Sequence, residues 1–251
     1  MTVFVATYRK FSPPARDVAR TRANVKNSDI LSRFLELYAR PDVFLDWGDD
    51  PGFWSATTVF GDVRRASWGV CRRTLRASLS AGDVVVFFCA APKVAVWDYH
   101  WIGFGTVKEV VSRADIWGSP DYAGYRTFLN VLAEPDGAGW AECESFFPKH
   151  KDWLQRLPNY VLFDPAPEAS AFQIFGAPRV ASYTDTVPEI WDDSPVARGI
   201  EDLLFERRPE RRLRTSTTGY AHTHMRIEAE PVATMSMRSK LAALAAQHLV
   251  G

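Results

Sequence analysis

The sequence predicts an α+β fold in which a small closed β-barrel carries peripheral helices. Residues 84–90 form a continuous apolar run bounded by a Gly-Asp turn and by Pro92, as expected for a strand buried on both faces. In the following stretch, 99–107, Gly103 and Gly105 share one face of a strand, which indicates a sharp bend or a close backbone approach. Two strands joined by a short loop and bent by glycines are typical of a small barrel.

The other elements follow in chain order. Residues 3–8 are β-branched and aromatic and predict an opening strand. Helical spacing of apolar residues predicts a helix over 29–38, capped by Asn27 or Ser28. Further elements are expected as strands at 125–132, 140–146 and 160–163 and as helices at 196–205 and 239–249. Residues 1–205 are assigned to the α+β domain, and residues 206–251 to a basic linker with a helical C-terminal appendage.

Charge is balanced over the whole chain but unevenly placed along it. The 251 residues contain 30 Lys and Arg and 30 Asp and Glu. Residues 9–40 hold eight basic and three acidic side chains, residues 62–79 hold five and one, and residues 185–206 hold one and seven. Eleven of the thirteen basic residues in the first two segments are arginines, whose planar guanidinium suits bidentate contacts to phosphate. The sequence therefore allows a local cationic surface on a neutral protein.

Tryptophan is abundant, and five of the nine indoles fall within residues 47–101. An indole provides a flat apolar surface that serves a protein core and a stacking platform equally well. Strand alternation places Tyr99 and Trp101 on one side of the predicted second strand and His100 on the other. If the Tyr99 and Trp101 side faces a pocket it can stack a base, and if it faces the core it only fills volume.

Three segments together resemble the PUA-like superfamily, which includes the EVE, YTH and ASCH domains. They are Ser67-Trp68-Gly69-Val70-Cys71-Arg72, the turn and strand at 81–88, and the glycine-containing strand at 102–107. The same order is similar to predicted nucleotide-modification-associated domains. The resemblance covers residues 1–8 and 55–132 and implies a barrel that binds nucleic acid, often by flipping one base into an aromatic pocket. The ASCH-type lysine, glutamate and arginine signature is absent, so no catalytic residue is carried over.

The leading prediction is a nucleic-acid-binding protein that recognises a modified or flipped base. The predicted base pocket is lined by Trp54, Trp68, Tyr99 and Trp101. The predicted phosphate contacts are Arg64, Arg65, Arg72 and Arg73. DNA is favoured over RNA as the partner, a free nucleotide is the other ligand considered, and the oligomeric state is left open.

Two other functions stay open at this stage. The first is an enzyme acting on DNA bases or nucleotides, which needs a polar cluster at the barrel mouth; Asp46, Asp98 and His100 are its candidates. The second is a protein-interaction module in which the tryptophans are core and the acidic segment 185–206 is the contact surface.

The sequence predicts neither a metal nor a cofactor. The acidic cluster at 46–50 is interpreted as a solvated turn, and His222 and His224 lack a third ligand. No Walker loop, nucleophile elbow or zinc-deaminase motif is present, and the three cysteines show no disulfide or zinc spacing. No apolar run approaches the roughly 20 residues of a membrane helix, so no membrane partner and a cytoplasmic location are expected.

Overall fold

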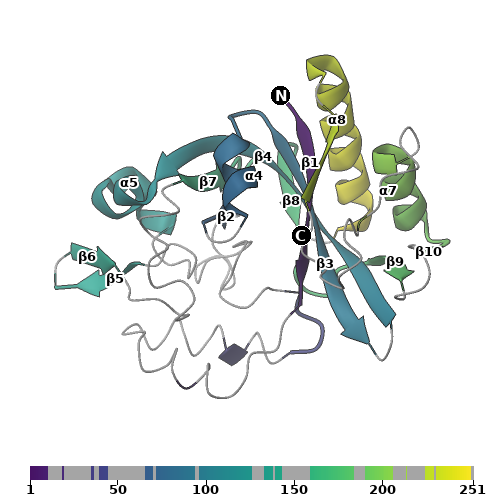
Figure 1. The fold of residues 1–251 in the computed structure, drawn as a ribbon, viewed down its shortest axis with the longest axis horizontal. Helices are drawn as coiled ribbons and strands as arrows, with labels where there is room; N and C mark the ends of the chain where they lie inside the picture. The colour runs from purple at the N-terminus through teal and green to yellow at the C-terminus, as the bar shows by residue number, and fades with distance from the viewer. Residues whose placement is uncertain are drawn as a thin grey trace.

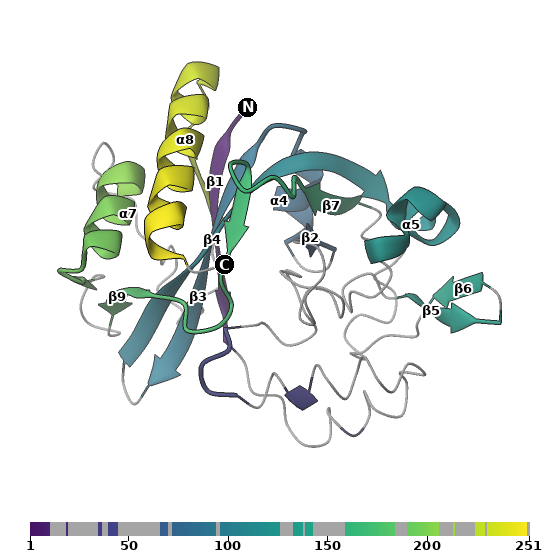
Figure 2. The same ribbon diagram turned by 180° about the vertical axis from the view of Figure 1, so that it is seen from behind.

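A mixed β-sheet lies at the centre of the computed structural model, with helices on both sides of it (Figures 1 and 2). The structure describes residues 1–10, 19, 35–36, 40–44, 66–69, 72–93, 96–125, 133–137, 139–142, 159–183, 190–205, 213, 224–228 and 230–249. Within these residues the sheet has nine strands, and its main path runs in the order β10-β9-β4-β3-β1-β11. These strands are β1 (Val3–Arg9), β3 (Val84–Lys93), β4 (Val96–Ser112), β9 (Arg179–Tyr183), β10 (Ile190–Trp191) and β11 (His224–Glu228).

Shorter elements surround this path. The strands β2 (Ser67–Trp68), β7 (Asn159–Phe163) and β8 (Ser170–Phe172) complete the sheet, and β5 (Ala133–Asp136) and β6 (Gly139–Glu142) form a separate hairpin. The described helices are α4 (Arg73–Ser78), α5 (Arg113–Gly118), the 3-10 helix η1 (Pro120–Tyr125), α7 (Pro195–Phe205) and α8 (Pro231–His248). The structure thus confirms the α+β class.

The described strands do not close into the small barrel that the sequence predicts. Their main path is open, with β10 at one edge and β11 at the other. The reason lies in β4, which is 17 residues long. Its first residues pair with β3 and β9, and its last residues leave both strands and pair with β7. The sheet therefore branches along β4 instead of closing on itself.

Three predicted strands are confirmed with small changes of boundary. The opening strand β1 pairs in parallel with β3 and antiparallel with β11. The apolar run is β3, and its first seven residues are buried, as a strand covered on both faces requires. The glycine-containing strand is β4, which forms an antiparallel hairpin with β3.

The two glycines of β4 allow neighbouring strands to approach it closely, and β8 pairs with β4 at this point. Gly103 has φ +134°, and a Cβ atom there would lie 1.9 Å from the Ala171 carbonyl oxygen. A Cβ atom at Gly105 would lie 2.6 Å from the Phe163 ring. The close backbone approach predicted from the glycine spacing is therefore present at β8.

The sheet has two differently covered faces. Helices α7 and α8 pack on the face that carries Tyr99 and Trp101, which we call the α7/α8 face. The other face carries Tyr8, Cys89 and His100 and is called the His100 face. Helix α4 and strands β2 and β7 lie on the His100 side in both ribbon views (Figures 1 and 2).

The predicted C-terminal helix begins earlier than expected, at Pro231, and lies against the sheet. Its Leu241 and Ala245 are buried in the same cluster as Val3 of β1. The helix predicted at 196–205 is α7. The helix predicted at 29–38 lies outside the described residues except for Leu35 and Glu36, which are helical. The boundary between residues 205 and 206 stays a prediction.

Among the helices that the structure describes, none combines the length and the apolar character needed to cross a membrane.

Two further predicted strands are found in part or in full. The predicted strand at 160–163 lies in β7, and residues 140–142 of the predicted strand at 140–146 lie in β6. Residues 126–132 and 143–146 of the two remaining strand predictions lie outside the described part of the chain.

Candidate functional site

The aromatic residues predicted to bind a base lie in the core where they are described. Trp68 is 1% exposed on the His100 face, where its ring meets Phe87 edge-on at 5.4 Å. Tyr99 and Trp101 have no exposed surface and lie on the α7/α8 face. The alternation predicted around His100 is therefore confirmed, and the Tyr99 and Trp101 side faces the core. The structure does not bring these three rings together in an open pocket.

Of the four arginines predicted to contact phosphate, the structure describes the side chain of Arg72. Arg72 is half-buried, adopts φ 46° before α4, and donates from its guanidinium to the Thr7 carbonyl oxygen at 2.9 Å. This bond ties α4 to β1 and leaves Arg72 with a structural role. Arg73 is the first residue of α4, and nothing is described of its side chain. Trp54, Arg64 and Arg65 lie outside the described residues.

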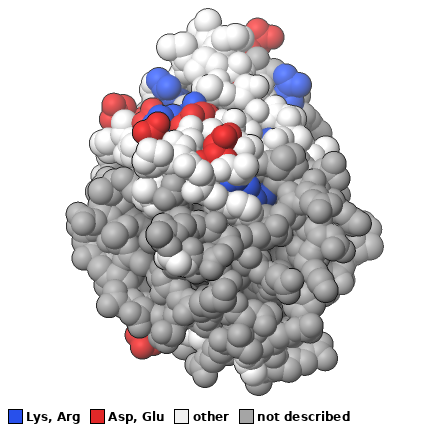
Figure 3. All heavy atoms as spheres, turned by 90° about the vertical axis from the view of Figure 1, so that its left-hand side faces the viewer, with Lys and Arg blue, Asp and Glu red and all other residues white. Residues whose placement is uncertain are grey.

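Charges on the described surface are mixed rather than collected into one field. The face in Figure 3 shows acidic and basic side chains side by side over its described upper part. Two members of the acidic segment 185–206 have basic partners: Asp192 binds Arg179 at 2.8 Å, and Asp193 binds Arg198 at 2.7 Å. Neighbouring charges of opposite sign partly cancel each other's electrostatic potential at longer distances.

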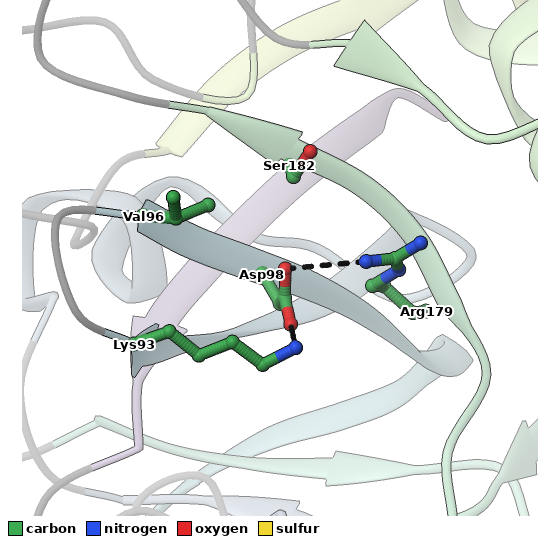
Figure 4. A pocket seen from close by; sticks show the side chains of 5 residues that line it. All are labelled: Lys93, Val96, Asp98, Arg179 and Ser182. Carbon is green, nitrogen blue, oxygen red and sulfur yellow. Dashed lines mark ion pairs between the residues drawn. The ribbon is translucent and has the colours of Figure 1, made fainter.

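One group of ionisable residues does converge, at the end of the sheet where β3 turns into β4. We call it the hairpin-end site. An open pocket of about 650 Å³ lies there, lined by Lys93, Val96, Asp98, Arg179 and Ser182 (Figure 4). Register explains the convergence, because Asp98 is paired with Ala91 on β3 and with Ser182 on β9, so these side chains share the His100 face.

Asp98 organises this pocket. The Asp98 side chain is 3% exposed, and its two oxygens face different cations: Oδ2 meets the Lys93 ammonium, and Oδ1 lies 3.6 Å from the Arg179 guanidinium. Lys93 and Arg179 remain 62% and 46% exposed. A buried carboxylate thus fixes one end of each cationic side chain while solvent reaches the rest.

His100 lies beside this pocket on the same face of β4. It is paired with Arg179 on β9 and with Cys89 on β3. Its Nδ1 lies 2.8 Å from the Ala177 carbonyl oxygen, and its ring stacks on Phe44 with centroids 4.0 Å apart. Burial lowers the pKa of His100 below its ordinary value, and this effect outweighs the Ala177 bond, which raises the pKa.

Lys10, the residue that follows β1, lies near His100. Its Nζ donates to the Pro41 carbonyl oxygen at 2.7 Å and lies 4.9 Å from the centre of the Phe44 ring. Burial lowers the pKa of Lys10, opposed by the nearby Cys89 and Asp42. Phe44 is thus in contact with both His100 and Lys10.

A fourth cation lies at the same end of the sheet but on the opposite face. The Arg9 guanidinium lies 4.7 Å from the centre of the half-buried Trp97 ring, which itself stacks beside Tyr183. Four cations therefore lie near the ends of adjacent strands: Arg9, Lys10, Lys93 and Arg179. Asp98 and Asp192 pair with the last two, and Asp42 lies near Lys10.

Only part of this site is evident in the sequence. Of the three predicted members of a polar cluster, Asp98 and His100 lie on one face of β4, and Asp46 lies outside the described residues. Lys10 follows β1, Lys93 ends β3 and Arg179 begins β9, nearly 80 residues beyond His100. Only the register of the sheet joins them. The one usable signal was the i, i+2 spacing of Asp98 and His100, which places both on one strand face.

Comparison of the chain with protein-family models, with curated proteins and with solved structures finds no match. Within the described residues, no group of three His, Cys, Asp or Glu side chains is placed to hold a metal ion. Cys89, the cysteine that is described, is buried and forms no disulfide. The candidate site is therefore defined by its own geometry.

Proposed function

We propose that the protein binds a nucleic acid and contacts its phosphodiester backbone at the hairpin-end site. The observation that carries the proposal is the convergence of Lys93 and Arg179, whose side chains are 62% and 46% exposed, on one open pocket. Arginine and lysine side chains supply most of the backbone contacts that proteins make to nucleic acids.

The pocket favours a phosphodiester over a more highly charged group. It is lined by Lys93, Arg179 and the carboxylate of Asp98, and Arg179 is also paired with Asp192 at 2.8 Å. The positive charges are therefore balanced by carboxylates, so a singly charged phosphodiester meets less repulsion there than a terminal phosphate, which carries more negative charge near neutral pH. Lys10 adds a further cation on the same face of the sheet.

The proposed ligand is of the class implied by the resemblance to PUA-like domains, but the proposed phosphate contacts are now Lys93 and Arg179. DNA is the favoured partner, and a PUA-like relationship of the fold belongs to the same proposal. The buried Trp68, Tyr99 and Trp101 receive no role in base binding. Trp54, Arg64 and Arg65 stay predicted contacts.

Binding is tested by fluorescence anisotropy with labelled single-stranded and duplex oligonucleotides of DNA and RNA in a salt series. We expect the double variant Lys93→Gln/Arg179→Gln to bind duplex DNA at least about tenfold more weakly than the wild type. Its log Kd should also depend less on log salt concentration, with a slope smaller by about 1.8, because each lost phosphate contact removes about 0.9.

A matched control removes two positive charges elsewhere. Arg198 on α7 and Lys240 on α8 are exposed and lie outside the hairpin-end site. The variant Arg198→Gln/Lys240→Gln should bind as the wild type does. If both double variants bound DNA equally weakly, the lower affinity would be due to net charge alone, and the proposed contact site would be wrong. If the protein bound no oligonucleotide at low salt, the proposed function itself would be wrong.

A further inference from the structure

The end of the β3–β4 hairpin extends beyond the two strands that flank it. On one side β1 ends at Arg9, so residues 91–93 of β3 lie past it. On the other side β9 ends at Tyr183, which is paired with Trp97, so Val96 of β4 lies past it. In both ribbon views this end of the hairpin projects past β9 (Figures 1 and 2). We call residues 91–93 and 96–97 the ribbon end.

Cations lie on both faces of the ribbon end. Lys93 and Arg179 belong to the pocket on the His100 face, and both side chains are partly exposed. Arg9 is half-buried on the α7/α8 face, where its guanidinium lies 4.7 Å from the centre of the Trp97 ring. Among the described residues no carboxylate is paired with Arg9. Positive charge is therefore presented in two opposite directions.

The rim between these cations is apolar. Pro92 is exposed at the ribbon end, and Ala91 and Val96 are half-buried there. Apart from Lys93, the ribbon end thus offers solvent few polar side-chain groups. An apolar rim with a cation on each side is complementary to a groove of a nucleic acid, whose floor consists of base edges and whose two walls carry phosphates.

The thickness of the ribbon end selects one kind of groove. A two-stranded ribbon with its side chains is about 10 Å thick. The major groove of B-form DNA is about 12 Å wide and admits such a ribbon, whereas the minor groove is only about 6 Å wide. The major groove of an A-form RNA duplex is deep and too narrow for side chains to enter. The dimensions therefore favour DNA, and its major groove.

We propose that the ribbon end enters the major groove of duplex DNA and contacts both of its strands. Lys93 and Arg179 contact the phosphates of one strand, and Arg9 contacts the phosphates of the other. Pro92 and Val96 then meet the base edges, where the thymine methyl group is the apolar contact available. This inference rests on the proposed function and names the form of nucleic acid that the same site binds.

The first test compares Arg9→Gln with the wild type on a duplex and on one of its two strands alone. On the duplex we expect binding to weaken about fivefold or more, and the salt slope to fall by about 0.9, because one phosphate contact is lost. On the single strand, which has no second backbone, the affinity should change by less than about twofold. The matched control Arg198→Gln removes an exposed charge on α7 and should alter neither affinity.

The second test uses the wild type, so it does not depend on how a variant folds. Methyl green, which occupies the major groove, should weaken binding to the duplex about tenfold or more, whereas netropsin, which occupies the minor groove, should weaken it less than about twofold. Both compounds are cations, so neutralisation of phosphate charge does not explain a difference between them. A duplex of RNA with the same sequence should bind about tenfold or more weakly than the DNA duplex.

The outcomes separate this inference from the proposed function. If Arg9→Gln weakened binding to the duplex and to the single strand equally, or left both unchanged, contact with two strands would be wrong. If netropsin competed and methyl green did not, or if the RNA duplex bound as tightly as DNA, the placement in the major groove would be wrong. In each of these cases binding by Lys93 and Arg179 would stand, whereas failure to bind any oligonucleotide would overturn the proposed function.

Discussion

Replacing Gly103 by alanine is expected to destabilise the fold severely. The residue has φ +134°, a conformation that an L side chain adopts at a cost of about 1–3 kcal/mol. The new Cβ atom would lie 1.9 Å from the Ala171 carbonyl oxygen and 2.9 Å from the carbonyl carbon. These are backbone atoms of β8, so no side-chain rotation relieves the contact.

The relief available is a shift of β8 by more than 1 Å. Such a shift would strain the bond from the Gln173 N–H to the Ile102 carbonyl oxygen and the bond from the Thr106 N–H to the Ala169 carbonyl oxygen. Each is worth about 0.5–1.5 kcal/mol. Together with the backbone conformation, the loss in free energy of unfolding should reach about 4 kcal/mol, a large part of the total for a typical domain.

Urea unfolding followed by tryptophan fluorescence measures this loss. Gly118→Ala is the matched control, because a Cβ atom there meets nothing within 4 Å, and it should change the free energy of unfolding by less than about 1 kcal/mol. If Gly103→Ala were as stable as Gly118→Ala, the close pairing of β8 with β4 at Gly103 would be wrong.

Three further outcomes are expected. Trp101→Ala should lower the free energy of unfolding by about 3–5 kcal/mol in thermal or urea unfolding, since the ring is fully enclosed; a loss below 1 kcal/mol would contradict that burial. Asp98→Asn should lower it by about 1–3 kcal/mol, because the buried side chain loses its charged contacts with Lys93 and Arg179. The loss stays modest because both exposed cations regain water, and an unchanged unfolding midpoint would count against the ion pairs at the pocket. The pKa of His100 is lower in the folded protein than in the unfolded chain, so the unfolded chain binds more protons and stability should fall as pH drops below 6.5; His100→Asn should lack this dependence, and a wild type equally stable at pH 5 and pH 7.5 would contradict it.

The sequence predicted those features that depend on neighbouring residues. Alternation placed Tyr99 and Trp101 opposite His100, and the apolar run 84–90 identified a strand buried on both faces. The paired glycines indicated a close backbone approach, which is present at β8. In each case the feature can be predicted from the two-residue period of a strand or from the absence of a glycine side chain, without knowledge of distant contacts.

The features that could not be predicted from the sequence depend on pairing between segments that are distant along the chain. The sequence did not show that β4 would continue to 17 residues and exchange its partners, so a closed barrel was expected where the described strands form an open path. Nor can composition decide whether an indole lines a pocket or a core, since both uses require the same surface. Lys93 and Arg179 meet Asp98 only because β3 and β9 flank β4 in a particular register.

The position of β1 also has a consequence for the order in which the protein assembles. Of the described strands it is the first along the chain, yet one of its edges is covered by β11, which begins at His224. Until then the nascent chain presents an unsatisfied row of backbone N–H and C=O groups. The hairpin of β3 and β4 likewise waits for residues 159–183 before its remaining partners exist. Late completion of this kind slows folding and lengthens the time during which a ribosome-bound chain is open to mispairing or to capture by a chaperone.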